Sequence, residues 1–119
     1  MKNSKPDFGK IGEDIACKFL SDKGFKIIQR NYRFERGEID IIAEDGDVLV
    51  FVEVKTRTNL EYGPPEYAIT KSKQKQIKKI AEAYLWEKEI KDRDCRIDVV
   101  AIILRKNNKH NINHIPNAF

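Results

Sequence analysis

A short turn between two apolar segments does most to limit the folds open to this chain. The turn is Asp45-Gly46-Asp47, and it separates the apolar segments 38–44 and 48–56. A glycine between two aspartates is typical of a tight hairpin turn, so we expect the two segments to form antiparallel strands. In such a hairpin the numbers of paired residues add up to about 92 or 93. This register decides which side chains meet across the two strands.

The periodicity of the other segments predicts an α/β fold around this hairpin. Apolar residues recur at helical spacing in one segment before the strands and in one after them. The stretch Tyr62-Gly63-Pro64-Pro65 interrupts regular structure before the second helix. The expected order is αβββαβ with a weaker final strand, which gives a mixed central β-sheet flanked by helices. The expected elements are helices over 9–22 and about 70–90, and strands over 25–32, 38–44, 48–56, 96–104 and, more weakly, 112–115.

The length of 119 residues fits one domain, 1–119, with a modest hydrophobic core. The first residues lack the apolar core of a signal peptide, and no segment approaches the ~20 apolar residues of a membrane-spanning helix. We therefore expect a cytoplasmic protein. The net charge of +4 is small, so an anionic partner has to be inferred from where the charges lie.

The strand 48–56 carries a carboxylate and an ammonium that its apolar composition does not explain. Side chains alternate along a strand, so Phe51, Glu53 and Lys55 are expected on one face. Two charges on so apolar a strand have a desolvation cost unless each meets a partner, a metal or water. A structural ion pair near the end of the strand is the simpler explanation, and Glu53 and Lys55 alone do not exclude it.

Two further carboxylates are expected near this strand. The hairpin register places Asp40 opposite Val52 or Glu53. Two carboxylates at one point repel each other and raise each other's pKa, unless a divalent cation such as magnesium lies between them. Glu13 lies at the edge of the apolar stripe of the first helix, so it can point along the sheet. An ordinary first-turn glutamate favoured by the helix dipole is the alternative for Glu13.

Glu13, Asp40 and Glu53-Val54-Lys55 together resemble the PD-(D/E)XK nuclease superfamily, which has a restriction-endonuclease-like αβββαβ core. The chain more closely resembles a bacterial family of predicted endonucleases, the YraN-like family, which is distantly similar to archaeal Holliday junction resolvases. One departure from the superfamily pattern is Ile39, where the superfamily has a proline that is not a ligand. The matching motifs run through nearly the whole chain: Gly9-Lys10-Ile11-Gly12-Glu13-Asp14-Ile15-Ala16, Arg30-Asn31-Tyr32-Arg33, Gly37-Glu38-Ile39-Asp40, Phe51-Val52-Glu53-Val54-Lys55-Thr56-Arg57, Tyr62-Gly63, Arg96-Ile97-Asp98-Val99-Val100 and Asn117-Ala118-Phe119.

The resemblance implies metal-dependent hydrolysis of phosphodiester bonds. In the superfamily, acids at the positions of Asp40 and Glu53 and the backbone carbonyl at the position of Val54 hold Mg²⁺ (or Mn²⁺). The ion polarises the scissile phosphate and acidifies a bound water. Glu13 would complete the metal shell directly or through water. Lys55 would orient the water or stabilise the developing negative charge, so the resemblance implies catalytic roles for the three acids and this lysine.

The second predicted helix is rich in lysine. Between Lys71 and Lys79 there are five lysines and no acid, so much of the net charge is concentrated in two turns. Lys73 and Gln74 continue the apolar stripe of the helix, so we expect them to point towards the sheet and the site. Lysines here would contact phosphates, although a solvated helix face is an equally good explanation of this segment alone. The predicted nucleic-acid-binding residues are Arg57, Lys71, Lys73, Gln74, Lys75 and Lys78, and the loop 62–67 is also placed to approach a nucleic acid.

Other polar residues are expected to have structural roles. Glu38 shares a strand face with Asp40, and a structural or indirect role is expected for it. Arg96 and Asp98 lie on one face of a strand and are expected to form a salt bridge. His110 and His114 are expected to be surface histidines, because their segment does not favour a helix on which they could bind a metal.

These observations together predict a metal-dependent endonuclease that hydrolyses phosphodiester bonds in DNA. By analogy with the resolvases, branched DNA of the Holliday-junction type is the leading substrate. One such site cuts one strand, so symmetric cleavage of a junction would need two copies, and a homodimer is a hypothesis that rests on the relatives alone. The main alternative is a nucleic-acid-binding or adaptor protein that keeps the fold and has little or no cleavage activity. A plain structural domain fits the lysine-rich helix poorly.

Overall fold

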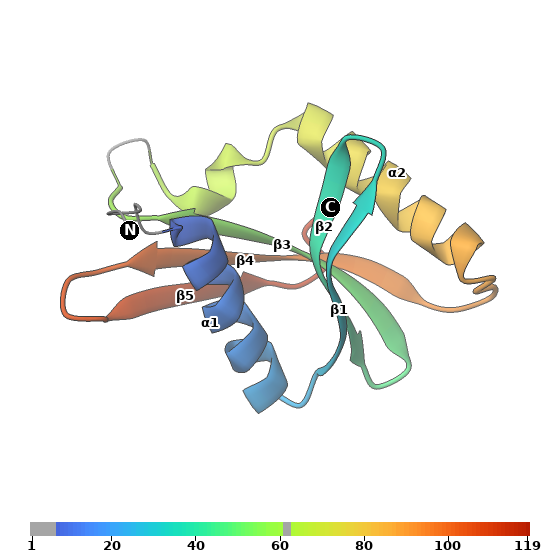
Figure 1. Ribbon diagram of the computed structural model, residues 1–119, viewed down its shortest axis with the longest axis horizontal. Coiled ribbons are helices and arrows are strands. Elements are labelled where there is room, and N and C mark those ends of the chain that lie inside the picture. Colours follow the sequence, from blue (N-terminus) through green and yellow to red (C-terminus); the bar gives the residue numbers. More distant parts are fainter. Residues whose placement is uncertain (1–6, 61–62) are drawn as a thin grey trace, which may run out of the picture.

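The computed structural model describes residues 7–60 and 63–119, and its helices pack against a β-sheet (Figure 1). Tyr62, which begins the expected break before the second helix, lies outside the described residues. In the described part of the chain, no helix is long and apolar enough to cross a lipid bilayer. The elements are α1 (Phe8–Asp22), β1 (Lys26–Phe34), β2 (Gly37–Asp45), β3 (Val48–Arg57), the short 3-10 helix η1 (Pro65–Ala68), α2 (Lys71–Glu87), β4 (Cys95–Leu104) and β5 (His110–Ile115).

The strands form one five-stranded mixed sheet in the order β1-β2-β3-β4-β5. β1, β2 and β3 form an antiparallel meander, β4 runs parallel to β3, and β5 returns antiparallel to β4. The chain crosses over from β3 to β4 through α2, as parallel neighbours require. The predicted α/β fold with a mixed sheet flanked by helices is therefore confirmed. The predicted and observed bounds differ most at two elements. β5 was expected to begin at 112 but begins at His110, which pairs with Leu104, and α2 was expected to end at about 90 but ends at Glu87.

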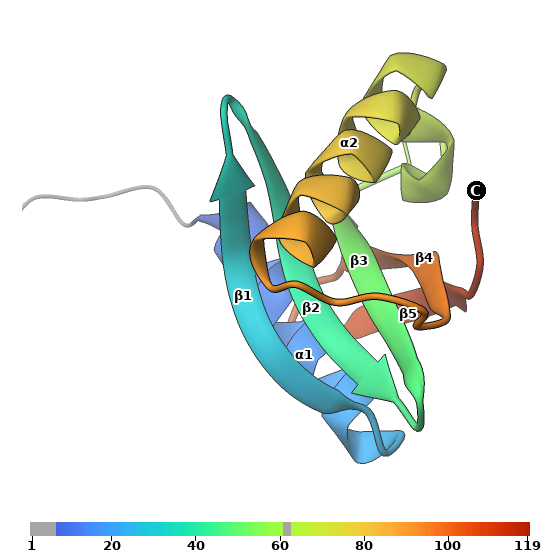
Figure 2. The same cartoon turned by 90° about the vertical axis from the view of Figure 1, so that its right-hand side faces the viewer.

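Each face of the sheet has its own hydrophobic core, and α1 and α2 cover opposite faces (Figure 2). Val50 and Val52 of β3 pack on the side of α1, whereas Phe51 packs on the side of α2. This alternation is the one expected for a strand that is covered on both faces. It places Glu53, two residues after Phe51, on the side of α2.

Strand β2 changes faces at Asp40. Ile39 packs in the core under α2, whereas Ile41, two residues later, packs in the core under α1. A regular strand would place both on one face. Pairing between β2 and β3 begins only at Ile41, which lies opposite Val52 in the predicted hairpin register. Asp40 therefore lies where β2 separates from β3.

A buried polar cluster on the side of α1 confirms one prediction and corrects another. Asp98 is fully buried, and Arg96 Nε donates to its Oδ1 at 2.9 Å, which confirms the predicted salt bridge. The prediction that His114 is a surface histidine is wrong, because its side chain is only 5% exposed and its Nε2 lies 2.8 Å from Asp98 Oδ2. The pairing of β5 with β4 turns this imidazole inward, where Phe19 and Phe25 contact it edge-on.

Candidate metal and nucleic-acid site

Asp40 is the central residue of the candidate site. Its Oδ2 accepts a 2.8 Å hydrogen bond from the backbone N–H of Val54, so the carboxylate takes the place of a strand partner where β2 and β3 separate. Burial, and after it the charge of Glu53, raises the pKa of Asp40 to about 8, and Glu13 contributes in the same direction. Without a bound cation, the Asp40 carboxyl therefore keeps its proton at neutral pH.

Glu53 is the second buried acid, with 5% of its surface exposed. Its carboxyl is hydrogen-bonded to that of Asp40. Lys73 of α2 places its Nζ 3.8 Å from Glu53 Oε2. Burial raises the pKa of Glu53, while Lys73, the hydrogen bond from Asp40 and Lys55 lower it. Because both carboxyls still have raised pKa values, the nearby ammonium groups do not fully compensate the burial of these acids.

Helix α1 brings Glu13 to the same place from the other side of the sheet. Glu13, Glu38 and Asp40 each offer one carboxylate oxygen, and these oxygens lie within 4.8 Å of one another. The helix approaches this closely because Gly12 has no side chain: a Cβ there would lie 1.9 Å from Thr56 Oγ1. The glycine before Glu13 therefore sets how near its carboxylate comes to Asp40.

Two residues of β1 hold Glu13 in place. Asn31 Nδ2 donates a 2.9 Å hydrogen bond to Glu13 Oε1, and Arg30 lies 3.7 Å from the same oxygen and 2.8 Å from Asp14. The backbone of Asn31 is left-handed, with φ of 54°, a conformation that asparagine adopts more readily than most residues. Sequence reasoning gave neither residue a role. An asparagine interrupting an apolar strand was the available signal, but it does not identify its partner.

The remaining predicted residues of β3 lie along the same strand. Lys55 is half-buried and close enough to Glu53 to lower the pKa of that acid. The Val54 amide is bonded to Asp40, so the carbonyl of the same residue lies beside the two buried acids. Arg57 is half-buried at the end of the strand, and its Nε has no hydrogen-bond partner within 7–60 and 63–119.

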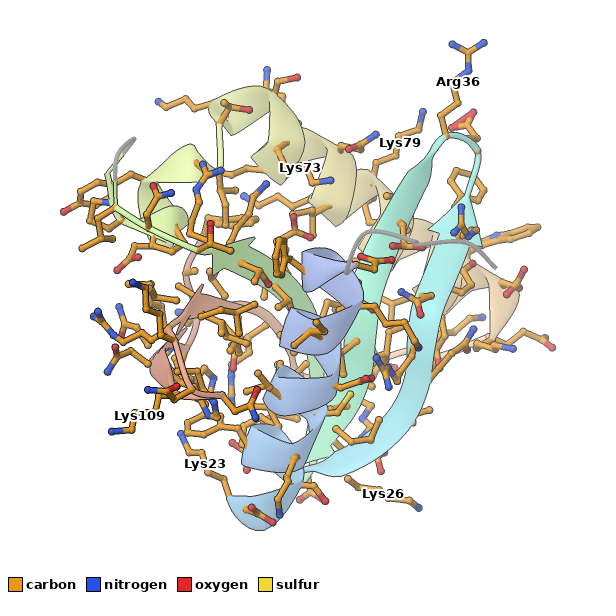
Figure 3. The ribbon with its side chains drawn as sticks, turned by 60° about the vertical axis from the view of Figure 1, so that its left-hand side comes forward. Lys23, Lys26, Arg36, Lys73, Lys79 and Lys109 are labelled. Atoms are coloured by element: carbon orange, nitrogen blue, oxygen red, sulfur yellow. The ribbon has the colours of Figure 1, made fainter. Side chains whose placement is uncertain are left out.

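Of the residues predicted on α2, the structure brings Lys73 to the acids and leaves the others outside. Gln74 is half-buried, but its amide donates to the backbone oxygen of Ile69 at 3.4 Å. Lys71, Lys75 and Lys78 are exposed and lie on the outer faces of the helix, as expected. Figure 3 shows Lys73 on α2. Tyr62 of the predicted contact loop 62–67 lies outside the described residues.

The donor set fits a hard divalent cation. Asp40 is shared between two groups of acids, one with Glu13 and Glu38 and one with Glu53. Carboxylate oxygens are the ligands that Mg²⁺ and Mn²⁺ prefer, and a cation would keep all of them ionised in spite of burial. Glu38, for which the sequence indicated a structural or indirect role, lies within reach of the same cation. Alternation along β2 predicted that Glu38 lies near Asp40. The position of Glu13 beside these two acids depends on the docking of α1, which the sequence does not specify.

Comparison with known proteins identifies a family. The sequence profile described as "Uncharacterised protein family UPF0102" matches residues 12–102. The chain is 48% identical over 114 residues to a UPF0102 protein of Dictyoglomus turgidum, covering 95% of this chain and 97% of that protein. It is also 50% identical over 103 residues to one from Dictyoglomus thermophilum, with 87% of each chain covered. A UPF0102 protein from Geotalea daltonii is 48% identical over 118 residues, and the match covers 99% of this chain and 93% of that protein.

Proposed function

The chain belongs to the UPF0102 family, and from its site we propose that it is a metal-dependent endonuclease of the PD-(D/E)XK superfamily that hydrolyses phosphodiester bonds in DNA. One observation supports this proposal most directly. Asp40 and Glu53 are buried, their carboxyls are hydrogen-bonded to each other, and the pKa of each is raised. Fold stability does not require such a pair, because uncompensated buried acids are destabilising. Buried acids with raised pKa values are typical of functional sites.

Residues of this chain would hold Mg²⁺ (or Mn²⁺) in defined roles. Asp40 and Glu53, with the carbonyl of Val54, would be the principal ligands, and Glu13 would complete the shell directly or through water. The ion, when bound, polarises a phosphate oxygen and acidifies a water. Asp40 must give up its proton to act as a ligand, so binding releases a proton below about pH 8.

Two ammonium groups lie where negative charge would develop. Lys55 follows Glu53 on the same strand face and would orient the attacking water or stabilise the phosphorane. Lys73 contacts Glu53 from α2, so it can exchange this carboxylate for a phosphate oxygen once Glu53 binds a cation. Arg57, Lys71, Lys75 and Lys78 would contact the DNA backbone, which fits an interface that is selective for shape more than for sequence.

Branched DNA of the Holliday-junction type is the substrate that we propose by analogy. Each site cuts one strand, so symmetric resolution of a four-way junction would take a homodimer. An adaptor that binds nucleic acid with little or no cleavage is the second candidate. The ion pair between Lys73 and Glu53 favours it, because this pair partly satisfies the site without a metal.

Cleavage of a labelled four-way junction tests the proposal. Wild-type protein is expected to cut with Mg²⁺ or Mn²⁺ and not with a chelator, and Glu53→Gln and Lys55→Ala are each expected to lose activity by at least about 10²-fold. Lys91→Ala, which changes an exposed cation after α2, is the matched control for Lys55→Ala. Junction binding without metal-dependent cutting would favour the adaptor, and cutting by Glu53→Gln at the wild-type rate would exclude this site.

A further inference from the structure

The part of the chain after Asp98 has a net charge of +3. After Asp98 the sequence contains no aspartate or glutamate, and it contains Arg105, Lys106 and Lys109. These three cations form a second basic segment in addition to the five lysines between Lys71 and Lys79. They lie in and beside the turn between β4 and β5, in a segment that also contains Asn107 and Asn108. We call residues 105–109 the hairpin tip.

The hairpin tip extends the sheet from the end at which the candidate site lies. In the parallel pairing of β3 with β4, Lys55 lies opposite Ala101 and Arg57 opposite Ile103. At about 3.3 Å per residue, the tip lies roughly 20 Å beyond the level of Lys55 along the same direction. Figure 1 shows the β4–β5 hairpin projecting from the body of the molecule beside the end of β3. Phosphates within about half a turn of a duplex bound at the site would therefore come within reach of the tip.

The two lysine side chains of the tip are available for a ligand. Some surface cations elsewhere pair with carboxylates, as in Lys18 with Asp22 at 3.2 Å and Lys79 with Glu35 at 2.8 Å, whereas others, such as Lys75, have no ion-pair partner in the described residues. Within the residues that the structure describes, none of the three cations of the tip has an ion-pair partner and all three side chains are exposed, but Arg105 Nε donates a hydrogen bond to Asn111 Oδ1 of β5. Lys109 points outward in Figure 3. No ion pair or side-chain hydrogen bond within the described residues therefore accounts for Lys106 and Lys109.

The conformation of the tip is fixed by the backbone. Arg105 N–H donates to the Lys109 carbonyl at 2.7 Å and closes the loop. Asn107 and Asn108 both adopt left-handed φ angles, of 63° and 59°. Asparagine tolerates this conformation and also offers a donor and an acceptor to a ligand. The loop therefore holds its cations on a defined turn and contributes no carboxylate that would repel a phosphate.

We propose, building on the nuclease function above, that the hairpin tip is a second nucleic-acid contact. It would bind the phosphate backbone on the opposite side of the site from α2. Residues 105–109 contain no apolar side chain that could enter a bilayer, so an anionic membrane is the less suitable partner. Lys73 and the exposed lysines of α2 approach the site from one direction, and the tip approaches it along β4. A bound duplex would span both contacts, with Asp40 and Glu53 between them.

A charge-reversal experiment tests this contact. The variant Lys106→Glu/Lys109→Glu is compared with Lys18→Glu/Lys91→Glu, which changes the net charge equally on exposed residues outside the tip. Binding of a labelled four-way junction and of a linear duplex is measured by fluorescence anisotropy with a chelator, over a range of salt concentrations. The tip variant is expected to bind at least about tenfold more weakly than the control variant, with a salt slope smaller by about 2. Circular dichroism checks that both variants fold.

The outcomes separate the tip from the site. If wild-type protein cleaves the junction but the two variants bind DNA equally well, the tip contact is overturned and the proposed nuclease function is still supported. Binding that depends on the tip, without metal-dependent cleavage, would support the tip contact and overturn the nuclease. If wild-type protein binds neither DNA, or if the tip mediates binding only to vesicles containing phosphatidylserine, the tip contact is overturned as well.

Discussion

The backbone N–H of Val54 donates a 2.8 Å hydrogen bond to Asp40 Oδ2. This bond ties a carboxylate of β2 to the strand that carries Glu53, at the point where regular pairing of the two strands ends. It also counters, but does not cancel, the effect of burial on the pKa of Asp40. The relative position of the two buried acids is thus fixed by one contact that needs no metal.

The raised pKa of Asp40 predicts how pH affects stability. In the folded protein its pKa is about 8, against 3.8 for the ordinary carboxyl, so between these values the folded state binds more protons than the unfolded state. The contribution is therefore fully present below about pH 3.8, is lost progressively as pH rises from there to about 8, and is gone above that value. Asp40→Asn cannot ionise and still offers an oxygen to Val54. Without metal, we expect this variant to be more stable than wild type at about pH 9 and similar to it only at about pH 3.5, below both pKa values.

Urea unfolding in the presence of a chelator measures this difference. Asp47→Asn, in the exposed turn between β2 and β3, is the matched control and should follow wild type at both pH values. Adding Mg²⁺ or Mn²⁺ should raise the Tm of wild type and leave Asp40→Asn unchanged. Parallel pH profiles for wild type and Asp40→Asn would contradict the raised pKa.

The register and the order of the elements could be predicted because they depend on local signals. The turn Asp45-Gly46-Asp47 fixes the hairpin, and Ile41 pairs with Val52 as the predicted sum requires. The reversal of faces between Ile39 and Ile41 could not be predicted, because both residues are equally apolar and alternation puts them on one side. It is this reversal that puts Asp40 between the two cores.

Contacts between distant segments also could not be predicted from the sequence. His114 is buried because β5 faces α1, where Asp98 accepts from it and Lys23 Nζ lies 2.8 Å from its Nδ1. Nothing in the local sequence around His114 indicates either partner. In the same way, Asn31 is recognisable as an unusual strand residue, but its bond to Glu13 depends on how α1 docks on the sheet.

Gly12 should be indispensable for the docking of α1. In Gly12→Ala, the new Cβ would overlap Thr56 Oγ1, so we expect a loss of about 1–3 kcal/mol in the free energy of unfolding in spite of the better helix propensity of alanine. Gly9→Ala lies on the same helix, and its Cβ would make an ordinary 3.4 Å contact with Asp7, so it should be neutral or stabilising by up to about 1 kcal/mol. Equal effects of the two substitutions in urea unfolding would exclude the close approach. Gly12→Ala should also weaken metal binding, because it moves Glu13.

Asp98 should be the most sensitive acid for stability outside the candidate site. It is fully buried and accepts from Arg96, from His114 and from the backbone N–H of Asn117 at 2.9 Å. Asp98→Ala leaves these donors without an acceptor, and we expect a loss of about 3–5 kcal/mol. Asp94→Ala, on the exposed segment before β4, should cost less than about 0.5 kcal/mol. A loss below about 1 kcal/mol for Asp98→Ala, measured by urea unfolding, would mean that the cluster contributes little.

Lys73 should affect metal binding in opposite directions at low and high pH. Its Nζ lies 3.8 Å from Glu53 and lowers the pKa of this acid, so Lys73→Met raises that pKa and makes the ligand harder to ionise. At low pH, where Glu53 keeps its proton, the variant should therefore bind Mg²⁺ more weakly than wild type. Once Glu53 is ionised in both proteins, loss of the neighbouring ammonium removes repulsion of the metal, and the variant should bind Mg²⁺ more tightly.

Lys75→Met distinguishes this effect from a general loss of positive charge. Lys75 is exposed on the same helix and has no ion-pair partner in the described part of the chain, so its removal should leave Mg²⁺ affinity near wild type at every pH. Isothermal titration calorimetry across this pH range measures both variants. Affinity curves for Lys73→Met and wild type that cross support a direct coupling between Lys73 and the ligand set. If Lys73→Met instead follows Lys75→Met throughout, the contact with Glu53 does not influence the metal site.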